Sequence, residues 1–175
     1  MEVLVWIQEN LRSAAGDAVM TFISRSADVS FVWILLSVIF LLDKRTRRMG
    51  LLVLMTIPLC YILNDLVLKE IFMTPRPFTA NTEYLPLVDA SGYSFPSGHT
   101  SSSFASAVMI FLHNKRAGAA ALAYAALVAF SRLYTYVHFP SDVIAGALLG
   151  TVCAVLVFMA AERKYPAGGG ASGGD

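Results

Sequence analysis

The feature that most limits how this chain can fold is a series of long apolar segments separated by short polar ones. Hydrophobic residues make up 57% of the 175 residues, charged residues only 14%, and the mean hydropathy is +0.64. A chain of this composition is solvated better by a lipid bilayer than by water. We therefore predict an all-α, polytopic membrane protein, a bundle of transmembrane helices, and not a water-soluble globular domain.

The apolar segments predict where the helices lie. Helices are expected at residues 29–42, 49–72, 97–112, 117–134 and 141–161. The first is short for a bilayer span, which needs about 20 residues, and the second ends before Pro75, which cannot continue a helix. Residues 73–96 are polar and rich in proline, which is typical of a loop. A loop of that length is usually functional.

The N-terminal segment has a different pattern. Between Leu4 and Phe22, apolar residues recur at helical spacing with acidic and basic residues among them. This pattern indicates an amphipathic helix lying in the membrane interface. The alternative is a first spanning helix whose polar face is covered by protein. We therefore expect five or six transmembrane helices in one domain, residues 1–165, followed by a flexible Gly-rich tail, residues 166–175.

Basic residues distinguish the two sides of the membrane. They gather at one set of helix ends, at Lys44, Arg45, Arg47, Arg48, Lys115, Arg116, Arg163 and Lys164. By the positive-inside rule these ends are cytoplasmic. The opposite helix ends are then expected to face the extracytoplasmic side of a bacterial plasma membrane.

The opposite helix ends carry a group of ionisable residues. These are Lys69, Arg76, His99, Arg132, His138 and Asp142. A lone Lys or Arg at a helix end usually extends to the water, and a lone interfacial His is usually just hydrated. Because ionisable side chains at membrane depth are costly, six of them at the same end indicate a functional site.

The segment Tyr93-Ser94-Phe95-Pro96-Ser97-Gly98-His99-Thr100 begins one of the predicted helices. Ser97 is expected to be the N-cap, and Gly98 allows a close approach of the backbone. The free N–H groups at such a helix N-terminus favour an anion, and a phosphate in particular. Taken alone, the motif also fits an ordinary capped helix.

In the segment from Ser131 to Asp142, a histidine precedes a carboxylate by four residues at the start of a helix. Asp142 is therefore expected to hold one imidazole nitrogen of His138. This contact fixes the tautomer and leaves a lone pair on the other nitrogen, as a nucleophile or base requires. The nearby cations Lys69, Arg76 and Arg132 can neutralise a phosphate. No paired carboxylates and no His/Cys ligand spacing predict a metal site.

Three segments together resemble the signature of the type 2 phosphatidic acid phosphatase superfamily. They are Lys69 followed by six residues and then Arg76-Pro77, the run Pro96-Ser97-Gly98-His99, and Ser131-Arg132 followed by five residues, His138, three residues and Asp142. Each segment alone is a weak or moderate signal. All three in order, at helix ends on one side, are highly specific, and the resemblance covers about residues 60–150.

The resemblance implies a metal-independent phosphatase that needs no cofactor. His138 would attack phosphorus, Asp142 would orient it, and His99 would protonate the leaving oxygen. By the same match, the phosphate would be held by Lys69, Arg76, Ser97, the backbone amide of Gly98, and Arg132. Water activated by His138 or His99 would then hydrolyse the phosphohistidine.

Three classes of function follow from these observations. The first is a membrane lipid phosphatase, with undecaprenyl diphosphate preferred and phosphatidylglycerophosphate, phosphatidic acid or a lipid A phosphate as other substrates. The second is vanadate-dependent halide oxidation, although enzymes of that kind are larger and soluble. The third is a non-catalytic lipid-binding scaffold, for which His138→Ala would leave function intact. The net charge of +1 is uninformative about nucleic acid, and we expect a lipid and no nucleic-acid partner. No sequence signal points to an oligomeric state.

Overall fold

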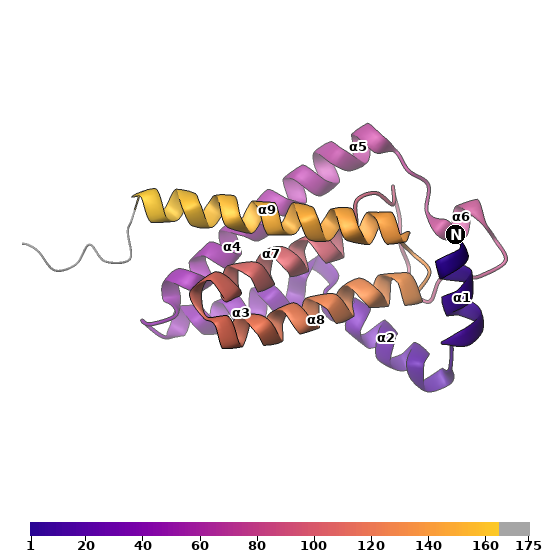
Figure 1. Ribbon diagram of the computed structural model, residues 1–175, viewed down its shortest axis with the longest axis horizontal. Helices are drawn as coiled ribbons and strands as arrows, with labels where there is room; N and C mark the ends of the chain where they lie inside the picture. The colour runs from indigo at the N-terminus through magenta and orange to yellow at the C-terminus, as the bar shows by residue number, and fades with distance from the viewer. Residues whose placement is uncertain (165–175) are drawn as a thin grey trace, which may run out of the picture.

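The computed structural model describes residues 1–164, and the tail predicted at 166–175 lies outside the described residues. Residues 1–164 are helical with no strand, as predicted. The helices are α1 (Glu2–Asn10), α2 (Ala14–Ser26), η1 (Asp28–Ser30, a 3₁₀ turn), α3 (Phe31–Leu42), α4 (Arg47–Tyr61), η2 (Ile62–Leu68, a π-helix), α5 (Lys69–Phe72), α6 (Pro77–Ala80), α7 (Gly98–His113), α8 (Lys115–Tyr134) and α9 (Pro140–Lys164). Figure 1 shows the longer helices running side by side along the long axis.

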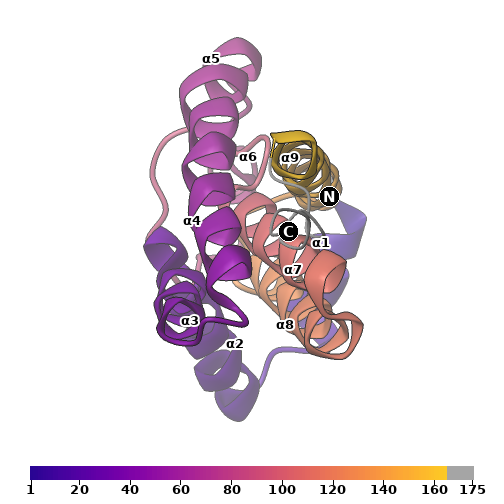
Figure 2. The ribbon, with the colours of Figure 1, turned by 90° about the vertical axis from the view of Figure 1, so that its left-hand side faces the viewer.

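Helix α7 is the centre of the bundle. It packs against α4, α8 and α9, which surround it in Figure 2. Its buried residues are mostly small, namely Thr100, Ser101, Ser102, Ser103, Ala105, Ser106, Ala107, Met109 and Ile110. Small side chains let helix backbones approach closely in a membrane. At the crossing with α9, a Cβ on Gly150 would lie 2.1 Å from the carbonyl oxygen of Ser101, so only glycine fits there.

Apolar side chains fill the bundle and also cover its outside. The main core cluster includes Trp33, Val53 and Met109, and Trp33 Nε1–H donates a 2.9 Å hydrogen bond to Ser103 Oγ. Large apolar residues are exposed on the outer faces, for example Leu148 on α9 at 64%. Since only a bilayer solvates such faces well, the chain is a multi-pass membrane protein.

Three helical stretches are long and apolar enough to cross a membrane. They are Arg47–Ala80, Lys115–Tyr134 and Pro140–Lys164. A fourth arises if α2 and the stretch Asp28–Leu42, which meet at 55°, form one bent span. By length and composition, residues 1–164 therefore contain three or four candidate spans.

The single helix predicted from Leu4 to Phe22 is wrong, because the chain breaks between α1 and α2. Ser13 caps α2 by accepting a 3.1 Å hydrogen bond from the N–H of Gly16. A capping serine satisfies a free N–H at the start of a new helix. The periodicity of the apolar residues continues through this break, so periodicity alone did not reveal it.

Helix α1 packs against the end of α8. Gln8 Nε2–H donates to the carbonyl oxygen of Tyr134 at 3.1 Å, and the Tyr134 hydroxyl donates to Asp17 Oδ1 at 3.0 Å. Arg12 in turn donates two hydrogen bonds to the carboxylate of Asp17, at 2.7 and 2.8 Å. These polar contacts tie the N-terminal helices to the bundle.

The two ends of the bundle differ in their connections. The α3–α4 and α7–α8 turns and the last residue of α9 lie at one end in Figure 1. The loop from residue 73 to 97 and the α8–α9 connection lie at the other. The predicted site residues therefore come together at this second end.

Candidate active site

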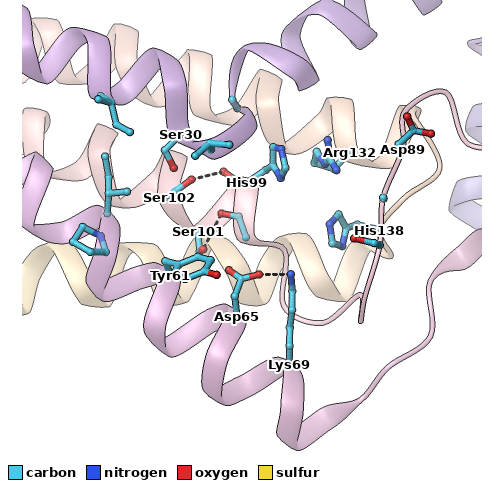
Figure 3. Close-up of a pocket in the computed structure, with 18 of the residues that line it drawn as sticks. Ser30, Tyr61, Asp65, Lys69, Asp89, His99, Ser101, Ser102, Arg132 and His138 are labelled. Atoms are coloured by element: carbon cyan, nitrogen blue, oxygen red, sulfur yellow. Dashed lines mark hydrogen bonds and ion pairs between the residues drawn. The ribbon is translucent and has the colours of Figure 1, made fainter.

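A cavity of about 750 Å³ brings together side chains from all three predicted segments. Six of the eight predicted site residues line it, namely Lys69, Arg76, Gly98, His99, Arg132 and His138. Figure 3 shows His99, Arg132 and His138 on one side of the cavity, with Asp65 and Lys69 on the other. The remaining two, Ser97 and Asp142, lie behind the lining residues and contact them.

His138 and Asp142 form the pair that their spacing predicted. Nδ1 of His138 lies 3.3 Å from Oδ2 of Asp142, and the two side chains are 2% and 1% exposed. The backbone N–H of Phe139 donates to the same carboxylate oxygen at 2.8 Å. Asp142 is in the first turn of α9, where the helix dipole also favours its negative charge.

Ser94 contacts both members of this pair. A serine in a loop is common, so the sequence did not indicate this role. Its hydroxyl donates to Oδ2 of Asp142 at 2.5 Å and lies 3.3 Å from Nδ1 of His138. Ser94 is fully buried. The carboxylate is therefore held from three sides, by a ring nitrogen, a hydroxyl and a backbone amide.

The second ring nitrogen of His138 is directed toward a cation. A terminal nitrogen of Arg76 lies 3.4 Å from Nε2 of His138. A guanidinium only donates, so Nε2 accepts, and the ring proton is on Nδ1, facing Asp142. Burial lowers the pKa of His138, and the positive charges of Arg132 and Arg76 lower it further against the opposing effect of Asp142. At neutral pH the ring is thus neutral and carries a lone pair on Nε2.

Arg76 is fixed by the backbone of two loops. It donates hydrogen bonds to the carbonyl oxygens of Ser91 at 2.8 Å, Gly92 at 3.1 Å and Val137 at 3.0 Å. Its side chain is buried, and it precedes α6, where Pro77 occupies the first position. A guanidinium held this way needs little reorganisation to bind an anion.

Arg132 is buried in the last turn of α8. One terminal nitrogen donates to Ser24 Oγ, while Nε has no hydrogen-bond partner among residues 1–164. A buried unpaired donor is costly. Arg132 also lines the cavity, so its positive charge can act on an anion bound there.

Lys69 is paired with Asp65 across one helical turn, as their spacing allowed. Both residues line the cavity. They lie where the π-helix η2 passes into α5, and π-helical segments often occur at functional sites. A Cβ on Gly98 would lie 3.1 Å from Oδ2 of Asp65, so the absence of a side chain lets the start of α7 approach this pair.

Ser97 is the N-cap of α7, as predicted. Its Oγ accepts hydrogen bonds from the N–H of Thr100 at 3.5 Å and from the Thr100 hydroxyl at 3.0 Å. Ser97 is fully buried and does not line the cavity. Gly98, the next residue, does line it.

His99 has a partner that the sequence did not indicate. Its Nε2 lies 2.7 Å from Oδ1 of Asp28, which belongs to η1 in the N-terminal third of the chain. Within residues 1–164, no three His, Cys, Asp or Glu side chains are grouped to hold a metal ion. Each histidine of the cavity lining thus contacts a carboxylate outside the lining, His99 with Asp28 and His138 with Asp142. The lining also contains three cations, Lys69, Arg76 and Arg132, and two carboxylates, Asp65 and Asp89, and the excess of positive charge favours an anion such as a phosphate.

Known proteins share both the sequence pattern and the fold. The chain matches the model of the PAP2 superfamily over residues 49–166. It is 35% identical to the undecaprenyl-diphosphatase of Sulfolobus acidocaldarius over 140 residues, which are 79% of this chain and 67% of that protein. It resembles the crystal structure of Aquifex aeolicus LpxE with a TM-score of 0.81 at 27% identity, over 90% of this chain and 93% of the other.

A second solved structure, a transmembrane PAP2 type phosphatidylglycerolphosphate phosphatase from Bacillus subtilis, superposes with a TM-score of 0.71 at 31% identity, covering 87% of this chain and 79% of that one. The family match covers all three segments on which the resemblance was based. The expectation from the sequence is thereby confirmed, and the chain belongs to the PAP2 superfamily.

Proposed function

We propose that this protein is an integral membrane phosphatase that removes a phosphate from a lipid through a phosphohistidine on His138. The proposal rests on the surroundings and the protonation state of His138. Its ring is buried and neutral, Asp142 is on one nitrogen, and the other nitrogen belongs to a cavity lined by Arg76, Arg132 and Lys69. Such a nitrogen is a nucleophile beside a binding site for a doubly charged group.

In the first step, Nε2 of His138 forms a bond to phosphorus while the bond from phosphorus to the leaving oxygen breaks. This oxygen is the bridging oxygen of a lipid diphosphate, or the lipid oxygen of a monoester. It keeps the electron pair of that bond and takes a proton from the His99 imidazolium. His138 then carries the phosphoryl group on Nε2 and a proton on Nδ1, so it is a cation that Asp142 stabilises. Help from a general acid is worth about two to four powers of ten in rate.

After the first step His99 is neutral. In the second step, water attacks phosphorus and gives a proton to His99. The bond between phosphorus and Nε2 breaks, and its electron pair returns to His138. The cations around the cavity stabilise the equatorial oxygens in both steps. In this scheme Lys69, Arg76, Arg132 and the amide of Gly98 bind the phosphate, and Ser97 supports it by capping α7.

The apolar part of the cavity suits a lipid chain. Its walls between η1–α3 and α4 consist of Val29, Ser30, Ile34, Ile57, Pro58 and Tyr61. Figure 3 shows Ser30 and Tyr61 at one end of the cavity and His138 toward the other. We infer that the headgroup binds at His138 and that the chain extends between these helices. Undecaprenyl diphosphate is the preferred substrate, because a relative with 35% identity is an undecaprenyl-diphosphatase.

Our proposal extends to the placement of the enzyme. The basic residues at the α3–α4 and α7–α8 turns and at the end of α9 favour a cytoplasmic position for that end. The active site then faces the extracytoplasmic side of a bacterial plasma membrane. We further propose a single domain over residues 1–165, five or six spans, and an N-terminal segment that lies partly in the interface.

Purified protein in detergent tests this function. We expect release of inorganic phosphate from undecaprenyl diphosphate, and the rate should be unchanged by EDTA because no step needs a metal. Phosphatidylglycerophosphate, phosphatidic acid and a lipid A phosphate complete the panel and identify the substrate. Loss of activity in EDTA would contradict the metal-independent step, and inactivity on the whole panel would refute the function.

Ser94→Ala should lower kcat by about 10- to 100-fold, because a hydrogen bond to a charged group is worth about 1.5–3 kcal/mol. Ser94 does not line the cavity, so KM should change little. The matched control is Ser106→Ala, a buried serine of α7 that donates to Ser102. Steady-state phosphate release measures both variants, and equal kcat values for the two would show that Ser94 does not support Asp142.

A further inference from the structure

The N-terminal segment reaches the active site although it lies outside residues 49–166, which match the family model. Ser24 of α2 accepts a hydrogen bond from Arg132, and Asp28 of η1 contacts His99. Both contacts join residues far apart in the chain, 108 positions for Ser24 and Arg132 and 71 for Asp28 and His99. The segment that links α2 to α3 therefore contributes to the polar site.

The backbone around Asp28 is held in an unfavourable conformation. Val29 and Ser30 have φ values of 50° and 57°, in the left-handed region that non-glycine residues rarely adopt. For a β-branched residue such as Val29 this conformation is unusual and strained. The flanking residues Ala27 and Ser30 are buried at 1% and 8% exposure, so the surrounding structure holds this turn in place. Strain of this kind occurs mostly at functional sites.

The electrostatic surroundings explain what a carboxylate does at this position. Burial lowers the pKa of His99, and the positive charges of Arg132 and Lys69 lower it further, while the contact with Asp28 opposes this shift. Asp65 is paired with Lys69, and Asp142 is paired with His138, so neither of these carboxylates is the partner of His99. The hydrogen bond with His99 lowers the pKa of Asp28, and the charges of Arg132 and Arg25 lower it further against the effect of burial. Asp28 is thus the carboxylate in direct contact with His99, and its charge opposes that of the nearby cations.

We propose that Asp28 is a positioning residue for His99: its carboxylate accepts a hydrogen bond from Nε2–H, stabilises the imidazolium and leaves Nδ1–H to protonate the leaving oxygen of the lipid. The inference rests on the proposed function of His99 as the general acid. The site then has two histidine–carboxylate pairs. Asp28 orients the general acid, His99, and Asp142 orients the nucleophile, His138. The role of Asp28 also makes the N-terminal segment part of the catalytic unit.

A double-mutant cycle on a lipid phosphomonoester tests the inference, with full-length Asp28→Asn, His99→Ala and the double variant. If Asp28 acts through His99, Asp28→Asn lowers kcat about 10- to 100-fold, and His99→Ala lowers it by about two to four powers of ten. The double variant is then no slower than His99→Ala, because the partner has already been removed. Asp43→Asn, an exposed aspartate at the α3–α4 turn, is the matched control and should stay within about twofold of the wild type.

The leaving group provides a second measurement that a folding defect would not change. A lipid diphosphate releases a phosphate monoester, which departs without a proton more readily than an alkoxide does. Asp28→Asn should therefore lose less activity on farnesyl diphosphate than on phosphatidic acid. Multiplicative losses in the double variant, equal losses on both substrates, or full activity of Asp28→Asn would each overturn the inference while the wild type remains active. A wild type inactive on every lipid would instead refute the proposed function, and the inference with it.

Discussion

His138→Ala is expected to abolish phosphate release, with kcat lower by at least about four powers of ten, because in the proposed mechanism the covalent intermediate forms on His138. Nδ1 of His138 faces Asp142, and the lone pair on Nε2 is directed toward Arg76, one of the residues that line the cavity. Alanine leaves the cations in place, and the substrate should still bind. Rapid quenching during turnover with radiolabelled substrate measures the step directly, since the phosphohistidine is labile in acid.

The matched control for this variant is His113→Ala. His113 lies in the last turn of α7, at the opposite end of that helix from His99, and its Nδ1 contacts the carbonyl oxygen of Met109 at 2.9 Å. We expect normal turnover and a normal amount of acid-labile label from this control. Label that persists in His138→Ala at the wild-type level would show that another residue is the nucleophile.

Asp142→Asn should lower kcat by about 10³- to 10⁴-fold, the loss typical when an orienting carboxylate becomes an amide. The new amide can donate to Nδ1 of His138 and so favours the tautomer with its proton on Nε2. That tautomer lacks the lone pair needed for attack. The amide also cannot balance the positive charge on the phosphorylated ring.

Single-turnover kinetics distinguish this effect from poor binding. The rate of phosphoenzyme formation should fall with kcat, while KM should change little because Asp142 does not line the cavity. The Asp43→Asn variant serves here too, as a carboxylate-to-amide change at the other end of the bundle. A loss in KM alone would assign Asp142 to binding, and turnover near the wild-type rate would remove it from the mechanism.

The helices were predictable because each depends on neighbours within a few residues. The segment predicted at 117–134 is observed as Lys115–Tyr134, and the one at 97–112 as Gly98–His113. The prediction failed at the N-terminus, where α1 and α2 replace a single helix. The break there depends on Ser13 and on contacts with Tyr134, which is more than 100 positions away. Periodicity averages over such local interruptions.

The site was predictable to the extent that its residues have unusual chemistry for a membrane chain. Asp65 and Lys69 are four positions apart in a continuous helical stretch, so helical geometry brings them together. His138 is also four positions from Asp142, but it lies in the connection just before α9, and this short connection places it beside the first turn of that helix. Ser94 escaped notice because a loop serine is common and its contact with Asp142 spans 48 positions. Asp28 escaped notice for the same reason.

Local sequence was thus sufficient to predict a helical membrane protein, the family and the histidines and cations that gather at one end. These properties follow from residue types and from spacings of a few residues. The hydrogen-bond partners of the histidines and cations could not be predicted in this way. Asp28 on His99 and Ser24 on Arg132 depend on how α2, α7 and α8 pack, because contacts between distant segments form only when the helices are assembled. Packing in three dimensions, and not the motif, therefore joined the N-terminal segment to the active site.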